Sequence, residues 1–154
     1  MIRFLKLSIL LWTLTSTSQP HVLTFSEARR LGVSSEELDK IYKSAVHSNP
    51  ELAVFKTPAE QQELQQAYVK FFQDFGSFLG AQKFSWESKT RCFNRIYMEK
   101  DGTVEYFLFD FGKNPLPQDK ERRFRELLSE FLKTRKFPIE ANEKFAQCSP
   151  ITYQ

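Results

Sequence analysis

The stretch RIYMEKDGTVEYFLFDF, residues 95–111, constrains the fold most strongly. Asp101-Gly102 at its centre is a strong hairpin signal, because Gly accepts the positive φ that a tight turn needs. The flanking segments, residues 91–98 and 104–111, are rich in β-branched and aromatic side chains, which favour strands. The stretch therefore predicts two antiparallel strands joined by a short turn.

The second of these strands is apolar on both faces. Successive side chains of a strand point to opposite sides, so Phe107, Phe109 and Phe111 share one face and Tyr106 and Leu108 share the other. We expect one face to pack against a helix and the other to be at least partly covered.

Two longer segments predict amphipathic helices that cover this sheet. Residues 57–79 begin with Thr57 as N-cap, Pro58 in the first turn and Glu60 completing a capping box. The second helix is expected over about 117–135 and ends before Pro138. Neither apolar stripe can be buried by its own helix, so we expect both helices to share one Phe-rich core on the same sheet. A ligand groove is the alternative for the aromatic stripe of residues 57–79. The chain has sixteen Phe residues to build it.

The remaining segments complete an α+β fold class. Residues 19–50 read as one or two short helices, with Ser34 and Glu37 in a capping-box pattern. The chain ends in a predicted strand that contains Pro150, a residue that strands tolerate at an edge or a bulge. The expected architecture is N-terminal helices followed by a β-β-α-β unit with a three-stranded antiparallel sheet. The expected domains are a signal peptide at 1–18, a short helical segment at 19–50 and an α+β domain at 51–154.

The first eighteen residues have the order of a secretory signal peptide. Arg3 and Lys6 precede an apolar run that is followed by small polar residues, and cleavage is expected before Gln19. The alternatives are an N-terminal membrane anchor or a buried helix. Cleavage predicts an exported protein, periplasmic or secreted, with no stable membrane insertion afterwards.

Charge argues against a nucleic-acid partner. The formal net charge is +3, and removal of Arg3 and Lys6 with the signal lowers it to +1. A nearly neutral chain lacks the basic surface that binding to nucleic acid requires.

Export also bears on the two cysteines. Cys92 and Cys148 each fall in a predicted strand, and two Cys in an exported chain favour one disulfide. The bond would place the terminal strand beside the first strand of the hairpin. Two buried free thiols are the alternative, and a catalytic thiol would need a His nearby, whereas His21 and His47 both lie far earlier in the chain.

No motif for catalysis is present. The sequence has no Ser–His–Asp set, metal triad, phosphate-binding Gly loop or G-x-S-x-G elbow. Glu105 and Asp110 are five residues apart in one strand and so point to opposite faces. We expect no catalytic residue, no metal site and no cofactor, hence a protein that is not an enzyme.

Residues 91–154 resemble the C-terminal domain of TonB-type energy-transducing proteins. The resemblance rests on KDGTVEYFLFDF, on KFP at 136–138 after the second helix, and on PITY at 150–153. The family's Pro-rich spanning segment and "YP" start motif are missing, so the resemblance implies the fold and partner binding by strand addition rather than energy transduction. The chain also resembles small exported proteins of the Bacteroidetes.

These expectations define a binding hypothesis. An open sheet offers an edge strand to which another chain can add through backbone hydrogen bonds. The expected role is a periplasmic binding or adaptor module, its partner another envelope protein and its contact residues Ser149, Ile151, Thr152 and Tyr153. Alternatives are a structural envelope-associated protein without a small ligand and, less favoured, a small hydrolase. The sequence indicates no oligomeric state.

Overall fold

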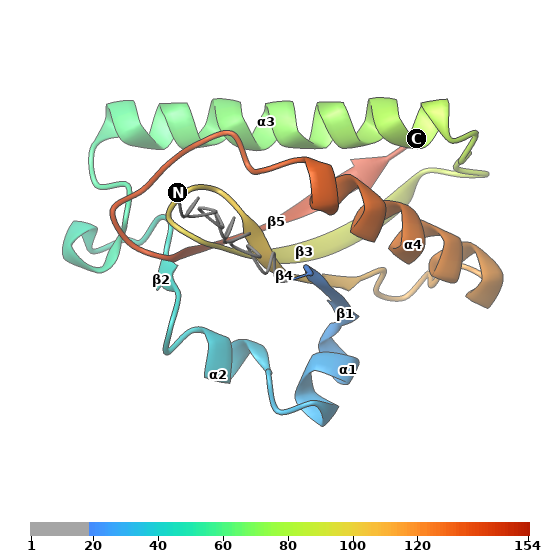
Figure 1. Ribbon diagram of the computed structural model, residues 1–154, viewed down its shortest axis with the longest axis horizontal. Helices are drawn as coiled ribbons and strands as arrows, with labels where there is room; N and C mark the ends of the chain where they lie inside the picture. Colours follow the sequence, from blue (N-terminus) through green and yellow to red (C-terminus); the bar gives the residue numbers. More distant parts are fainter. Residues whose placement is uncertain (1–18) are drawn as a thin grey trace, which may run out of the picture.

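Five strands form one mixed sheet in the order β1-β4-β3-β5-β2 (Figure 1). The computed structural model describes residues 19–154, so the expected signal peptide lies outside the described residues. The strands are β1 (His21–Thr24), β2 (Lys43–Ser44), β3 (Thr90–Met98), β4 (Val104–Asp110) and β5 (Phe145–Tyr153). The helices are α1 (Phe25–Arg30), α2 (Ser35–Leu38), α3 (Pro58–Ala81) and α4 (Gln118–Thr134), with a 3-10 turn η1 (Pro50–Leu52).

The α+β class is confirmed, but the three-stranded antiparallel sheet is wrong. The predicted strands β4, β3 and β5 are antiparallel neighbours, and β1 and β2 extend the sheet by parallel pairing to β4 and β5. Both added strands come from residues 19–50, where helices alone were expected. They are four and two residues long, too short to show an alternating pattern in the sequence.

The hairpin forms as expected. Gly102 has a φ of +79° in the turn between β3 and β4. The backbone N–H of Thr103 donates to Asp101 Oδ1 at 3.0 Å, and this local hydrogen bond stabilises the turn. The backbone N–H of Phe137 donates to the Gly102 carbonyl at 2.8 Å, so the turn is also anchored by the segment that follows α4.

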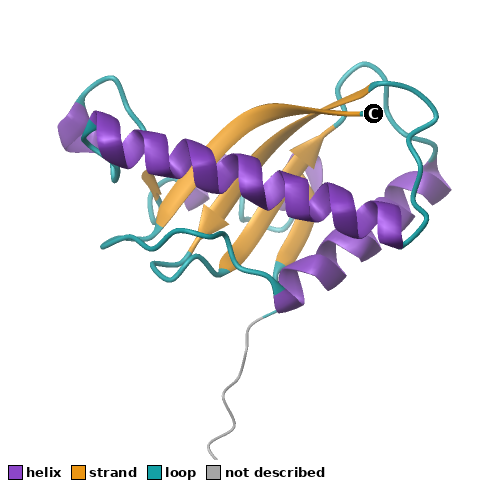
Figure 2. Ribbon diagram, turned by 90° about the horizontal axis from the view of Figure 1, so that it is seen from above, coloured by secondary structure: helices purple, strands orange, loops and turns teal. Residues whose placement is uncertain are grey.

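Helices α3 and α4 lie on the same face of the sheet, as expected (Figure 2). The capping box at the start of α3 is present, because Thr57 and Glu60 exchange backbone–side-chain hydrogen bonds. Phe71 of α3 and Phe131 of α4 are both buried, with ring centroids 5.5 Å apart. The two apolar stripes therefore share one core with Phe107 and other side chains of the sheet.

The opposite face of the sheet is covered only in part, by α1 and α2 (Figure 1). Tyr97 and Leu108 are buried there against Leu38. At the rim, Asp39 Oδ1 accepts from Arg95 Nη2 at 2.6 Å and from the Tyr97 hydroxyl at 3.1 Å. Phe93, further along β3 on the same face, remains 42% exposed. Phe93 is thus only partly covered, by the ring of Phe25.

The structure corrects the predicted disulfide. Cys92 and Cys148 are free thiols, the first buried and the second exposed. β3 and β5 are neighbours, as the disulfide argument required, but Cys92 pairs with Ile151 and Cys148 pairs with Arg95. The offset of three residues corresponds to about 10 Å along the strands and puts the two side chains on opposite faces of the sheet. Such a placement rules out the short Cα separation that a disulfide requires.

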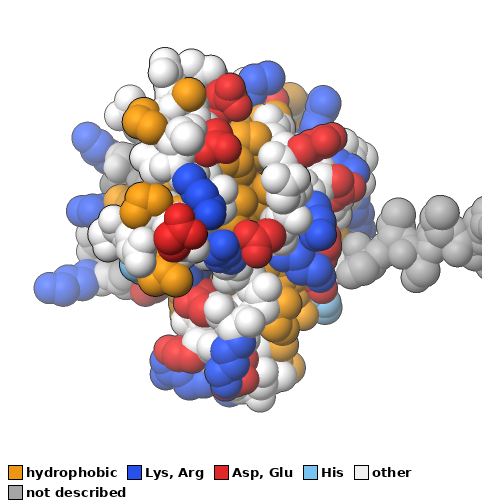
Figure 3. Space-filling model, turned by 90° about the vertical axis from the view of Figure 1, so that its left-hand side faces the viewer, with side chains coloured by type: hydrophobic (Ala, Val, Ile, Leu, Met, Phe, Trp, Pro, Cys, Tyr) orange, Lys and Arg blue, Asp and Glu red, His pale blue; other side chains and the backbone are white. Residues whose placement is uncertain are grey.

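No helix within residues 19–154 is long and apolar enough to cross a membrane. No cluster of His, Cys, Asp and Glu there has the geometry to hold a metal ion. Side chains of both charges are interspersed on the face seen in Figure 3, with hydrophobic atoms between them. This face does not carry the one-sided basic surface typical of nucleic-acid binding.

Candidate partner-binding edge

Most of the outer edge of β5 has no neighbouring strand among the described residues. β5 runs for nine residues, but β2 pairs only with Phe145 and Ala146. On its inner side, by contrast, all nine residues of β5 are in register with β3, from Phe145 opposite Met98 to Tyr153 opposite Thr90. The segment from Gln147 to Tyr153 therefore presents an open sheet edge.

The hydrogen-bonding groups of this edge follow from strand geometry. The Ala146 carbonyl points outward, since it accepts from the backbone N–H of Ala45 at 2.8 Å. Backbone groups alternate between the two edges of a strand, so those of Cys148, Pro150 and Thr152 also point outward. Pro150 thus sits where its missing N–H costs β3 no hydrogen bond, as Pro in edge strands generally does. The edge offers three carbonyl acceptors and two N–H donors to an added strand.

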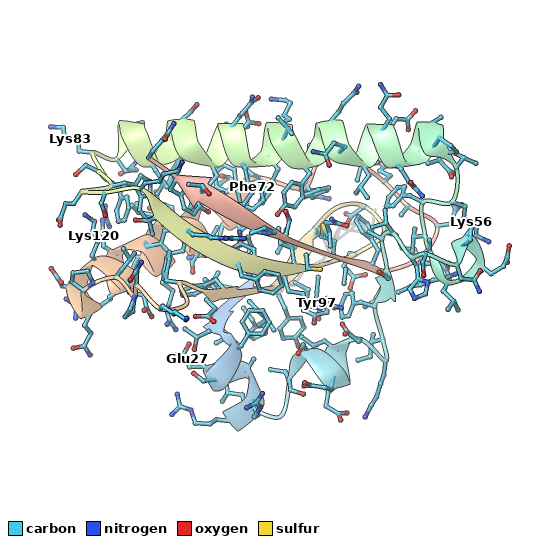
Figure 4. The ribbon with its side chains drawn as sticks, turned by 180° about the vertical axis from the view of Figure 1, so that it is seen from behind. Glu27, Lys56, Phe72, Lys83, Tyr97 and Lys120 are labelled. Atoms are coloured by element: carbon cyan, nitrogen blue, oxygen red, sulfur yellow. The ribbon has the colours of Figure 1, made fainter. Side chains whose placement is uncertain are left out.

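A groove of about 430 Å³ runs between this edge and α3. Phe72 lies under α3 above the sheet, as Figure 4 shows, and its ring centroid is 4.8 Å from that of Tyr68. Val69, next to it on α3, is 44% exposed. The lining residues are Gln65, Tyr68, Val69, Phe72, Gln73, Gln147, Ser149, Pro150, Ile151, Thr152 and Tyr153. None carries a charge, so the groove suits an uncharged segment of mixed apolar and polar side chains.

Three buried polar atoms under this groove have no hydrogen-bond partner in the described part of the chain. They are the hydroxyls of Tyr68 and Tyr153 and the Nδ2 of Asn94. Burial raises the pKa of Tyr68 to about 12, although the nearby side chains of Ser149 and Asn94 lower it in part. Buried polar groups are rarely left unpaired. Both tyrosines line the groove, but their hydroxyls lie buried beneath its surface.

The four contact residues expected from the sequence all line this groove. Ser149, Ile151 and Tyr153 alternate on the α3 face of β5, whereas the side chain of Thr152 points to the other face. For the aromatic stripe of α3 the sequence favoured a core face over a ligand groove, and in the structure Tyr68 and Phe72 of this stripe line the groove. Val69 was the available signal, as an apolar residue outside that stripe.

Comparisons of the chain with protein-family models, with curated proteins and with solved structures find no match.

Proposed function

We propose that this protein is a non-enzymatic, exported binding module that accepts an extended segment of a partner protein as an added strand on the outer edge of β5. The observation that carries the proposal is the length of β2, which covers only Phe145 and Ala146 of the nine residues of β5. An added strand gains its affinity from backbone hydrogen bonds to the edge and its specificity from pockets for alternate side chains.

The groove beside the edge supports this mode of binding. Alternate side chains of an added strand would face α3, where the exposed part of Val69 and the partly buried Phe72 offer apolar contact. The exposed side chains of Gln65 and Gln73 offer hydrogen bonds to a polar side chain. The resemblance of residues 91–154 to a family that binds peptides by strand addition agrees with this proposal, and the signal-like residues 1–18 support export to an envelope where such a partner resides.

The test removes one backbone N–H donor from the outer edge of β5 and keeps the hydrogen bonds between β5 and β3. Thr152→Pro deletes an N–H that points away from β3, whereas Thr152→Val keeps this N–H and loses only the hydroxyl. The wild-type protein and both variants are used to capture partners from an envelope extract of the native cell, and cross-linked peptides are identified by mass spectrometry.

We expect the wild type and Thr152→Val to capture the same partner, cross-linked near β5, and Thr152→Pro to lose it with an unchanged melting temperature. Equal capture by Thr152→Pro would show that the edge is not the binding site. Failure of the wild type to retain any specific protein would favour the structural alternative.

A further inference from the structure

A second cavity of the described chain lies beyond the α3 groove, at the end of the sheet where β3 begins and β4 ends. Its volume is about 760 Å³, within the range of small-molecule sites. Arg91 and Phe93 of β3 form one wall, and the loop of residues 112–117 between β4 and α4 forms another. Pro150 of β5 closes a third side and separates this cavity from the α3 groove, of which it is also part.

The charges around this cavity are predominantly positive. Four cations line it, Lys89, Arg91, Lys113 and Lys120, against the two carboxylates of Glu87 and Asp110. Lys120 Nζ lies 2.9 Å from Glu87 Oε1, so these two charges neutralise each other (Lys120 is labelled in Figure 4). Asp110 Oδ1 already accepts the backbone N–H of Gly112 at 2.8 Å.

The other three cations have no carboxylate partner within residues 19–154. Lys89, Arg91 and Lys113 form no ion pair there, although other exposed lysines of the chain, such as Lys70 with Asp74, do. They reach the cavity from two sides, since Lys89 directly precedes β3, Arg91 is near the start of β3, and Lys113 belongs to the loop after β4. Cations on two sides of a concave surface raise the local concentration of anions.

The floor of the cavity is apolar. Phe93 is 42% exposed and stacks on Phe25 with 5.8 Å between ring centroids, which leaves the rest of its ring to the cavity. Leu116 lies between Pro115 and Pro117 in the loop, and all three line the same space. An exposed aromatic ring beside an unpaired guanidinium is suited to a ligand with an apolar body and an anionic end.

From this geometry we propose that the cavity binds a hydrophobic carboxylate, with the carboxylate at Arg91 and the apolar body against Phe93 and Leu116. The planar fork of Arg91 matches a carboxylate in two hydrogen bonds. Lys89 and Lys113 add positive charge on either side of the carboxylate. This site does not depend on the α3 groove and stands whether or not β5 accepts a strand.

The probe is 3-phenylpropanoate, titrated into the purified full chain by isothermal calorimetry, with 3-phenylpropanamide as the uncharged match. We expect the acid to bind and the amide to bind at least about tenfold more weakly, because a charge-assisted hydrogen bond is lost. Binding of the acid should weaken between about 0.05 and 0.5 M salt, since salt screens the surrounding cations.

Variants locate the site. Arg91→Gln and Lys113→Gln change exposed side chains. Each should lower the affinity for 3-phenylpropanoate at least about threefold, and Arg91→Gln should lower it about tenfold. The matched control is Lys133→Gln, an exposed lysine of α4 that lines none of the described cavities and should leave affinity within about twofold. Absence of binding at about 10 mM acid, equal binding of the amide, or equal affinity of Arg91→Gln and Lys113→Gln with wild type would overturn the proposal.

A hydrophobic carboxylate can belong to a free carboxylic acid or to the carboxyl terminus of a peptide. The peptide Gly-Gly-Phe with a free carboxyl end is therefore compared with its amide and with 3-phenylpropanoate. Tighter binding of the peptide acid than of 3-phenylpropanoate assigns the site to a chain terminus, and weaker binding assigns it to a small molecule.

Discussion

At the residue scale, Gly102 is the one glycine of the described chain at which an added Cβ would overlap other atoms. Its φ of +79° belongs to the left-handed region, and a Cβ there would stand 2.1 Å from the Phe137 carbonyl oxygen. Gly112 has a similar φ of +65° but no atom within 4 Å of the added Cβ. Comparison of the two glycines therefore distinguishes the effect of backbone strain from that of steric overlap with a neighbouring segment.

We predict that Gly102→Ala lowers the free energy of unfolding by about 2–4 kcal/mol, from strain plus steric overlap with a backbone that cannot move alone. Gly112→Ala should cost only about 1 kcal/mol, because it meets strain without overlap. Urea unfolding of both variants measures the difference. Equal losses would mean that the Phe137 segment yields easily and does not anchor the turn.

The two thiols should differ sharply in reactivity. Burial raises the pKa of Cys92 to about 12, and the side chain has no exposed surface, whereas Cys148 is exposed on β5. We predict that Ellman's reagent at pH 8 labels one thiol in the native protein and two after denaturation without reductant. The native label should map to Cys148 by peptide mass spectrometry. If denaturation releases no thiol at all, the two cysteines are joined and the observed register is wrong.

At the scale of elements, the two edges of β5 differ in how far they are paired with other strands. Its inner edge is paired with β3 throughout, but its outer edge is paired only over Phe145 and Ala146. The backbone N–H groups of Ser149 and Ile151 point to β3, and those of Cys148 and Thr152 point outward.

We therefore predict alternating amide hydrogen exchange along β5, observed by NMR. Ser149 and Ile151 should exchange slowly and Cys148 and Thr152 quickly, because only the first two donate within the sheet. Protection of Cys148 and Thr152 in the free protein would contradict an open edge. Their protection on addition of a captured partner would be the direct sign of an added strand.

The packing of α3 against α4 makes a second prediction at this scale. Phe71 and Phe131 are 2% and 3% exposed, so Phe71→Ala or Phe131→Ala should each cost about 3–5 kcal/mol of unfolding free energy. The double variant should lose about 1 kcal/mol less than the sum, because the two rings contact each other. Phe93→Ala is the control on an exposed ring and should cost about 1 kcal/mol or less. Full additivity in the denaturation curves would show that the helices do not share a core.

At the scale of the whole molecule, buried tyrosine hydroxyls on both faces of the sheet make the stability of the fold depend on pH. Burial is the main cause that raises the pKa of Tyr42, Tyr68, Tyr97 and Tyr153 above the ordinary value of 10.0, to about 12 for Tyr68. Hydrogen bonding to Glu105 raises that of Tyr42 further. Because the folded state favours the protonated phenols, their contribution to stability is complete below pH 10 and declines as pH rises toward 12.

We predict that the melting temperature falls steeply between pH 10 and pH 12, with tyrosinate absorbance rising in the same transition as unfolding. Tyr68→Phe should retain more of its stability over this range than wild type, since it loses a phenol that must stay neutral. Titration of these phenols near pH 10 with the fold intact would contradict their burial.

The local pattern of the sequence determined the hairpin, both long helices and the chain order of the β-β-α-β unit. These depend on residues close in sequence, such as the turn at Gly102, the capping box at Thr57 and the apolar spacing through Phe71. Such signals act within a few residues, so they survive without knowledge of the rest of the chain.

Only the tertiary structure decided which strands lie beside one another and in what register. β1 and β2 join the sheet through residues at least 80 positions away in sequence, as His21 with Tyr106 shows, and nothing local marks them. A shift of one residue would reverse every side chain of β5, and the register of that strand places Cys148 opposite Arg95. The open edge of β5 and the cavity at Arg91 both result from this long-range pairing, which the burial of the whole sheet selects and no short segment encodes.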